Sequence, residues 1–158
     1  MMRALLAGAL LAAGAAAAEP AAAPAAQWWL NPGFYSWHFD RDADLREDNT
    51  GFGVEFVPAE RHAWMAGSFI NSTRDRTRYA GYQWRALRWE FGGLAVRAGV
   101  ALAVLDGYPR MRDGGAFVAA LPLLAIEGRT FGANLTVIPS LGDRVQGAVA
   151  IQLKLRVR

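Results

Sequence analysis

The stretch LAVRAGVALAV, residues 94–104, decides the fold class. Leucine, valine and one alanine fill every second position, and alanine, glycine and Arg97 lie between them. An alternation with a period of two is typical of a β-strand whose two faces meet different environments. The chain therefore contains a long strand with one strongly apolar face.

The same alternation recurs on both sides of this strand. It is clear at residues 35–40, 52–56, 80–84 and 149–157, and less regular at 63–70 and 130–138. A near-continuous apolar run at 116–126, interrupted by Pro122, supplies an eighth segment. We therefore expect an all-β chain of eight strands.

The connections between these strands alternate in length. Polar loops at 40–50, 71–78, 106–115 and 139–144 are separated by tighter turns at 58–61, within 87–93 and at 127–129. Long loops at one end and short turns at the other describe an up-and-down meander. Strands of about 9–11 residues suit the smallest membrane barrels. The sequence predicts an eight-stranded up-and-down antiparallel transmembrane β-barrel.

Periodicity leaves open which face of the strands looks inward. A soluble lipocalin-like barrel would turn the apolar face in, whereas a membrane barrel turns it out. Aromatic residues near the strand ends, Tyr35, Trp37, Tyr82 and Trp84, favour the membrane, because aromatic side chains gather at bilayer interfaces. The soluble periplasmic barrel is the alternative.

The first residues have the pattern of a signal peptide. Arg3 precedes an Ala/Leu/Gly run at 4–18 that ends in small residues, and the run is shorter than the roughly 20 residues of a membrane-spanning helix. We expect a signal peptide at 1–18, an Ala/Pro tether and short segment at 19–32, and the barrel at 33–158. The expected location is the outer membrane of a Gram-negative cell.

Composition excludes several classes of function. The chain has no cysteine, which rules out disulfides, thiolate metal sites and a cysteine nucleophile. The formal charge is +3 and no basic stripe accompanies it, so we expect no nucleic-acid partner. No histidine pair has metal-ligand spacing, and we expect no metal or other cofactor.

Five short segments in order carry a family resemblance: Trp37-His38, Phe69-Ile70-Asn71-Ser72, Ala80-Gly81-Tyr82-Gln83-Trp84, Leu121-Pro122-Leu123 and Val137-Ile138-Pro139. With their spacing, these resemble the outer-membrane lipid A palmitoyltransferases. The resemblance implies an enzyme that moves an acyl chain from phospholipid to lipid A. It also implies that phospholipid and lipopolysaccharide are the partners, and we expect a monomer.

The resemblance assigns roles to individual residues. His38 and Ser72 match the family's catalytic histidine and serine, and Asn71 stands where the family has an aspartate. Pro122 and Pro139 match the prolines that flank a lateral opening for lipid.

The acyl pocket is implied at Gly81 and Gln83, where Gln83 replaces a small residue that floors the family's pocket. A glutamine there fills space and needs hydrogen-bond partners, which Arg85 or Arg97 can supply. We therefore expect a shorter chain than palmitate, or none. A non-catalytic structural or lipid-binding barrel is the second hypothesis, since fold alone does not fix function.

The chemistry of the residues themselves supports similar roles. His38 lies on the polar face of the first strand, where a histidine can act as general base, and Asn71 cannot stabilise an imidazolium as a carboxylate does. Arginines in the loops suit phosphate groups; they are Arg41, Arg46, Arg74, Arg76, Arg78, Arg110 and Arg112. Acidic residues of the first loop are an alternative site, for divalent cations bridging phosphates; they are Asp42, Asp44, Glu47 and Asp48.

Overall fold

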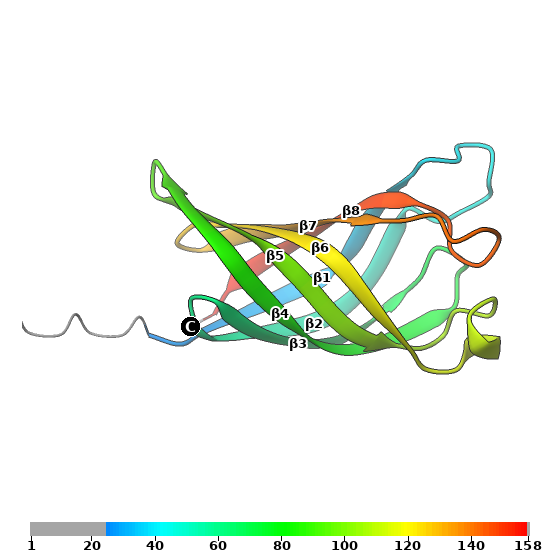
Figure 1. Ribbon diagram of the computed structural model, residues 1–158, viewed down its shortest axis with the longest axis horizontal. Coiled ribbons are helices and arrows are strands. Elements are labelled where there is room, and N and C mark those ends of the chain that lie inside the picture. Colours follow the sequence, from blue (N-terminus) through cyan, green and yellow to red (C-terminus); the bar gives the residue numbers. More distant parts are fainter. Residues whose placement is uncertain (1–24, 158) are drawn as a thin grey trace, which may run out of the picture.

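The computed structural model describes residues 25–157. The predicted signal peptide, 1–18, and the first part of the predicted tether lie outside these residues. The described chain forms eight strands (Figure 1): β1 Gln27–His38, β2 Asp48–Ala59, β3 His62–Ile70, β4 Arg76–Phe91, β5 Leu94–Leu105, β6 Phe117–Glu127, β7 Phe131–Ile138 and β8 Ala148–Arg156. The described residues also hold one short 3₁₀ turn, Arg112–Gly114. None of their helical segments is long and apolar enough to cross a bilayer.

The strands close into a barrel. Each strand pairs antiparallel with the next one along the chain, and β1 pairs antiparallel with β8. This confirms the predicted eight-stranded up-and-down antiparallel β-barrel. The first to fourth loops, at 39–47, 71–75, 106–116 and 139–147, gather at one end (right in Figure 1), and the short turns lie at the other. We call these the loop end and the turn end.

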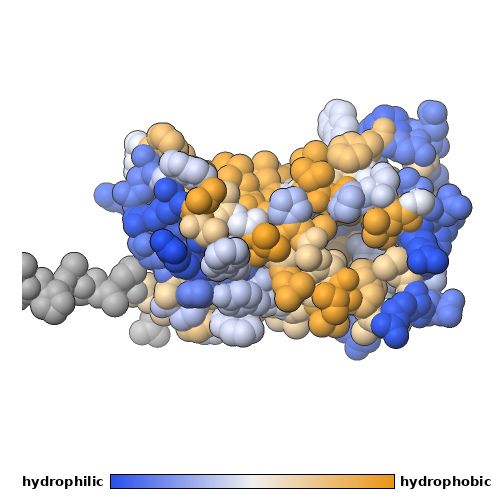
Figure 2. All heavy atoms as spheres, viewed as in Figure 1, coloured by the Kyte–Doolittle hydropathy of each residue, from blue (hydrophilic) through white to orange (hydrophobic). Residues whose placement is uncertain are grey.

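The apolar face of the strands points outward. On β5, Val100, Leu102 and Val104 are 42–49% exposed, whereas Arg97 and Ala103 are buried. Large aromatic side chains on other strands are exposed in the same way: Trp28, Tyr35, Trp37, Phe52, Trp64, Trp84, Trp89 and Phe131. Figure 2 shows hydrophobic residues over the middle of the visible face and hydrophilic residues toward both ends. A lipocalin-like barrel has the opposite orientation.

The first strand is longer than the sequence indicates. It begins at Gln27, ahead of the expected boundary at Gly33. The pairing of β1 with β2 shifts register between Asn31 and Gly33, and Gly33 has a φ of 113°, which favours glycine. This irregularity at Pro32–Gly33 interrupts the alternation. The strand residues before it, Trp28 among them, therefore do not join the pattern that begins at Tyr35.

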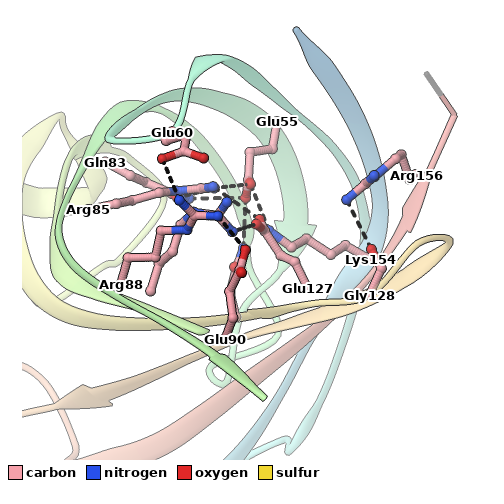
Figure 3. Close-up of polar contacts among 12 residues, drawn as sticks. Glu55, Glu60, Gln83, Arg85, Arg88, Glu90, Glu127, Gly128, Lys154 and Arg156 are labelled. Atoms are coloured by element: carbon pink, nitrogen blue, oxygen red, sulfur yellow. Dashed lines mark hydrogen bonds and ion pairs between the residues drawn. The ribbon is translucent and has the colours of Figure 1, made fainter. Parts of the chain in front are cut away.

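Charged side chains fill the turn-end half of the barrel (Figure 3). The Arg85 guanidinium contacts both Glu55 and Glu127, and Lys154 Nζ lies 2.7 Å from a carboxylate oxygen of each. Arg97 reaches Glu127 at 2.5 Å, and no side chain of the five is more than 8% exposed. Three cations thus face two carboxylates. We call these five residues the charge cluster; it closes the interior on the side of the turns.

Candidate functional site

A cavity of about 880 Å³ occupies the loop-end half of the barrel. One side of it is apolar and comes from β3, β5 and β6, with the lining residues Met65, Phe69, Ala101, Ala103, Leu105, Leu121 and Leu123. Ser36, His38 and Asn49 line it from β1 and β2, and Asn49 Nδ2 donates a 2.7 Å hydrogen bond to Ser36 Oγ. A cavity that is mostly apolar with a few placed polar groups suits an elongated apolar ligand.

The floor of the cavity consists of three amides. Gln83, Asn134 and Gln152 are the cavity-lining residues nearest the turn end on β4, β7 and β8. Gln83 Nε2 donates to Glu55 Oε2 at 3.1 Å, and Gln83 Oε1 accepts from Arg85 Nε at 3.1 Å. The partner that Gln83 needs is therefore Arg85 rather than Arg97. Floor and charge cluster form one hydrogen-bonded network, which sets the depth of the cavity.

The barrel wall is incomplete between β6 and β7. Their pairing covers only Leu124–Glu127 of β6 and Gly132–Leu135 of β7. Nearer the loops, residues 117–123 of β6 and 136–138 of β7 have no ladder partner on each other, although both are strands. One side-chain bond spans the gap, from Thr136 Oγ1 to the Pro122 carbonyl at 2.7 Å.

The cavity reaches this gap. Its lining includes Val118 and Ala120, which lie on the exposed face of β6, and Ile138 and Pro139 on the other side. Proline lacks the N–H that a ladder needs, so Pro122 cannot donate toward a neighbouring strand. We call the unpaired stretch the β6–β7 seam. Of the two prolines singled out from the sequence, Pro122 lies in the seam and Pro139 follows directly after the end of β7.

The structure brings His38 and Ser72 to the same cavity. His38 ends β1 and is 4% exposed, while Ser72 lies in the second loop, just beyond the end of β3. Within residues 25–157, His38 Nδ1 has no hydrogen-bond partner. The Ser72 carbonyl accepts a 2.9 Å bond from the Arg46 N–H, which ties the second loop to the first. Both side chains are thus available at the loop end, where the apolar lining gives way to the loops.

Asn71 has a different environment. Its side chain is fully buried: Nδ2 donates to Thr77 Oγ1 and to the Gly107 carbonyl, and Oδ1 accepts from the backbone N–H groups of Thr73 and Asp75. Asn71 is not among the cavity-lining residues. These bonds give Asn71 a structural role in shaping the second loop and in fastening it to the third.

Glu47 supplies a carboxylate near His38. From the sequence, this residue was considered only as part of a site for divalent cations. Its Oε2 accepts a 2.8 Å bond from the Tyr35 hydroxyl, and Arg41 contacts its other oxygen. These hydrogen bonds from Tyr35 and then Arg41 lower the pKa of Glu47, and the positive charge of a protonated His38 adds to the effect. The Glu47 carbonyl also accepts from Ser36 N–H at 2.8 Å, which holds this loop residue against β1.

Four of the seven arginines that the sequence places in loops bond carboxylates at the loop end, although the structure has Arg76 and Arg78 in β4 and Asp48 in β2. The pairs are Arg41–Glu47, Arg46–Asp48, Arg74–Asp44 and Arg78–Asp106. Arg110 donates to the Asp143 carbonyl at 3.0 Å and Arg76 to Ser68 Oγ at 3.4 Å. Among the described residues, no group of three or more His, Asp or Glu is arranged to hold a metal ion. Gly81 shares the strand with Gln83 but does not line the cavity.

Comparison with protein-family models and with curated protein sequences finds no match to this chain.

Proposed function

We propose that this protein is an outer-membrane β-barrel that admits a lipid acyl chain through the β6–β7 seam into its interior cavity. The observation that carries the proposal is the coincidence of the two features: the ladder between β6 and β7 stops at Leu124–Leu135, and the cavity lining continues along the unpaired stretches. A closed ladder would separate the cavity from the surrounding phase. Between β6 and β7 that ladder is missing over the length that the cavity lining follows.

The outward apolar face supports the membrane part of the proposal. A closed barrel satisfies its backbone hydrogen bonds internally, which makes it one of the two structures that can span a bilayer. Exposed aliphatic side chains such as Leu102 and Val104, and exposed aromatic ones such as Trp37 and Trp84, would be costly against water. Charged loops at one end suit the aqueous side of an interface.

The chemistry we propose is acyl transfer, which rests on His38 and Ser72. With the chain in the cavity, its ester lies at the loop end near both side chains. His38 takes the proton of an acceptor hydroxyl, and the acceptor oxygen bonds to the ester carbonyl carbon. The bond from that carbon to the donor glycerol oxygen then breaks, and the leaving oxygen receives the proton from His38. Ser72 orients the reacting groups, and the negative charge of Glu47 acts against the burial that disfavours the protonated form of His38. The family resemblance of the sequence supports phospholipid as donor and lipid A as acceptor.

The structural role of Asn71 favours a second candidate, a lipid-binding barrel without turnover. The hydrogen bonds of Asn71 are taken by the loops, so it does not replace a carboxylate beside His38. Such a barrel would hold a chain and release it unchanged.

Mass spectrometry of lipid A from cells with and without the expressed protein tests the proposal. Transfer adds one acyl mass, and His38→Ala and Ser72→Ala should each remove it. His62→Ala and Ser68→Ala are the matched controls, because neither residue lines the cavity, and they should keep the added mass. An added mass that survives both test variants would exclude the proposed chemistry. Its absence from the wild-type sample would favour the non-catalytic candidate.

A further inference from the structure

An apolar groove of about 590 Å³ lies on the outer wall of the barrel. Its middle is formed by two small residues that pair across strands, Ala66 on β3 and Ala80 on β4. Larger apolar side chains surround this pair; they are Val54, Phe56, Trp64, Tyr82, Leu102 and Val104. The alternation of the strands turns all of these side chains away from the interior cavity. The groove is therefore a depression in the surface that faces lipid in a membrane barrel.

Two arginines lie on the wall between the groove and the loop end. Arg76 and Arg78 precede Ala80 on the outward face of β4 and are exposed, whereas the residues between them are buried. Ser68 of β3 is the cross-strand partner of Arg78, and its hydroxyl accepts a 3.4 Å hydrogen bond from the Arg76 guanidinium. The Arg76 side chain thus points along the wall toward the groove. Among residues 25–157, all other arginines and the lysine of the strands lie nearer the turn end.

The charges beside the groove leave one cation in excess. The backbone N–H of Arg78 and its Nε donate to the Asp106 carboxylate, at 2.8 Å and 2.9 Å. In the described chain, the side chain of Arg76 bonds only the Ser68 hydroxyl. A charge on the outward face of a membrane barrel is tolerated near the headgroups and opposed by the hydrocarbon. The two arginines therefore mark the headgroup level of this wall, and the groove lies on its hydrocarbon side.

The groove extends to the β6–β7 seam. Val118, on the unpaired stretch of β6, lines both the groove and the interior cavity. Its cross-strand partner on β5 is Val104, which lines the groove as well. A chain that lies in the groove is thus separated from the seam only by the outward side chains of β6.

We infer that this groove is a docking site for an anionic phospholipid on its way to the seam. A phosphate diester carries one negative charge, which matches the one excess cation, and guanidinium groups bond phosphate oxygens well. The phosphate accepts hydrogen bonds from Arg76 and Arg78, and an acyl chain lies over Ala66 and Ala80. This inference rests on the proposed function for the membrane and the seam, and it deepens that function by naming the headgroup of the donor lipid.

Native mass spectrometry of the protein in detergent micelles tests the inference, because each bound lipid adds its own mass. The protein is titrated with phosphatidylglycerol and, separately, with phosphatidylcholine of the same acyl chains. One charge-assisted hydrogen bond corresponds to about tenfold in affinity, so we expect phosphatidylglycerol to bind about tenfold more tightly. Arg76→Gln should remove this preference. The matched control is Arg129→Gln, the same substitution in the turn between β6 and β7 at the other end of the barrel, and it should keep the preference.

A second variant tests the groove without touching the arginines. Ala80→Leu fills the middle of the groove and should weaken the binding of both lipids. Ala98→Leu is its control, because Ala98 lies on the outward face of β5 but does not line the groove.

Equal affinities for the two lipids, or a preference that persists in Arg76→Gln, would overturn the inference, as would unchanged binding in Ala80→Leu. Tighter binding of a diphosphorylated lipid A than of phosphatidylglycerol would overturn the assignment to phospholipid. The added acyl mass on lipid A remains a separate readout. Its absence, with the groove binding as expected, would refute acyl transfer and leave the docking site standing.

Conversely, an added mass without the headgroup preference would refute only the docking site.

Discussion

Replacing Glu55 by glutamine should destabilise the barrel more than replacing Lys154 by methionine. Glu55 receives Arg85, Lys154, Asn134 and Gln83, and its side chain is 1% exposed. The wild-type charge cluster has one cation more than it has carboxylates. Glu55→Gln leaves three cations sharing Glu127, whereas Lys154→Met leaves two cations with two carboxylates.

The magnitude follows from burial. Removing one partner of a buried ion pair costs about 3–5 kcal/mol, because the remaining charge stays desolvated and unpaired. We expect Glu55→Gln to fall in this range and Lys154→Met to cost less. The double variant should cost less than the two single variants together, since it removes the excess charge that Glu55→Gln creates.

The assay is urea unfolding in lipid vesicles, followed by tryptophan fluorescence. Glu90→Gln is the control, because its pair with Arg88 is 65% and 44% exposed and an exposed pair contributes only about 0–1 kcal/mol. If Glu55→Gln changes the free energy of unfolding no more than Glu90→Gln does, the charge cluster does not stabilise the barrel. A larger loss in Lys154→Met than in Glu55→Gln would refute the charge-balance reasoning.

Three further predictions concern the membrane, the floor and the third loop. The protein should fractionate with outer membranes and migrate differently on gels when boiled, because a closed barrel resists detergent unfolding; recovery as a soluble periplasmic protein would refute the membrane assignment. Gln83→Gly should let the cavity accept longer acyl chains. It should also lower the free energy of unfolding by about 1–3 kcal/mol, because Glu55 and Arg85 each lose a hydrogen-bond partner. An unchanged chain-length preference in binding titrations would show that Gln83 does not limit the depth of the cavity. The Arg78 backbone N–H and guanidinium lower the pKa of Asp106 below 3.8. The contact between Asp106 and Arg78 should therefore be complete above that pH and be lost as the pH falls through the lowered pKa. Asp106→Asn should remove this acid-induced change from the NMR signals of the third loop, and a change that persists in the variant would assign it to another group.

Much of the fold follows from local pattern. Alternation along each strand, and loops that alternate with turns, were enough to predict the strand number and the antiparallel order. The start of β1 was predicted too late in the sequence, because the register shift at Pro32–Gly33 breaks the alternation. The period of the strands left open whether the apolar face points inward or outward, and the aromatic residues near the strand ends favoured the outward orientation that the barrel has.

The site was only partly predictable. His38, Ser72 and the prolines were found through motifs, whereas the role of Asn71 depends on Gly107 and Thr77, which only the fold brings near. The charge cluster was missed because Glu55, Glu127 and Lys154 are far apart in the sequence. A signal was present: each is a charged residue on the otherwise small or polar face of an alternating or apolar strand. Charges in such positions indicate partners across the barrel interior.

Lateral entry of lipid is the central claim, and photo-cross-linking tests it most directly. The chain has no cysteine, so Pro122→Cys with Val137→Cys introduces one pair that can lock the β6–β7 seam as a disulfide. The locked and the reduced protein are placed in bilayers containing a phospholipid with a photoreactive group at the end of its acyl chain. Mass spectrometry then locates the adducts.

In the reduced protein we expect adducts on cavity residues such as Ala101 and Ala103 as well as on the outward Leu102 and Val104. Locking the seam should remove the cavity adducts and leave the outward ones, which serve as the internal control. Cavity adducts that persist in the locked protein, or that never form in the reduced one, would contradict lateral entry through the seam.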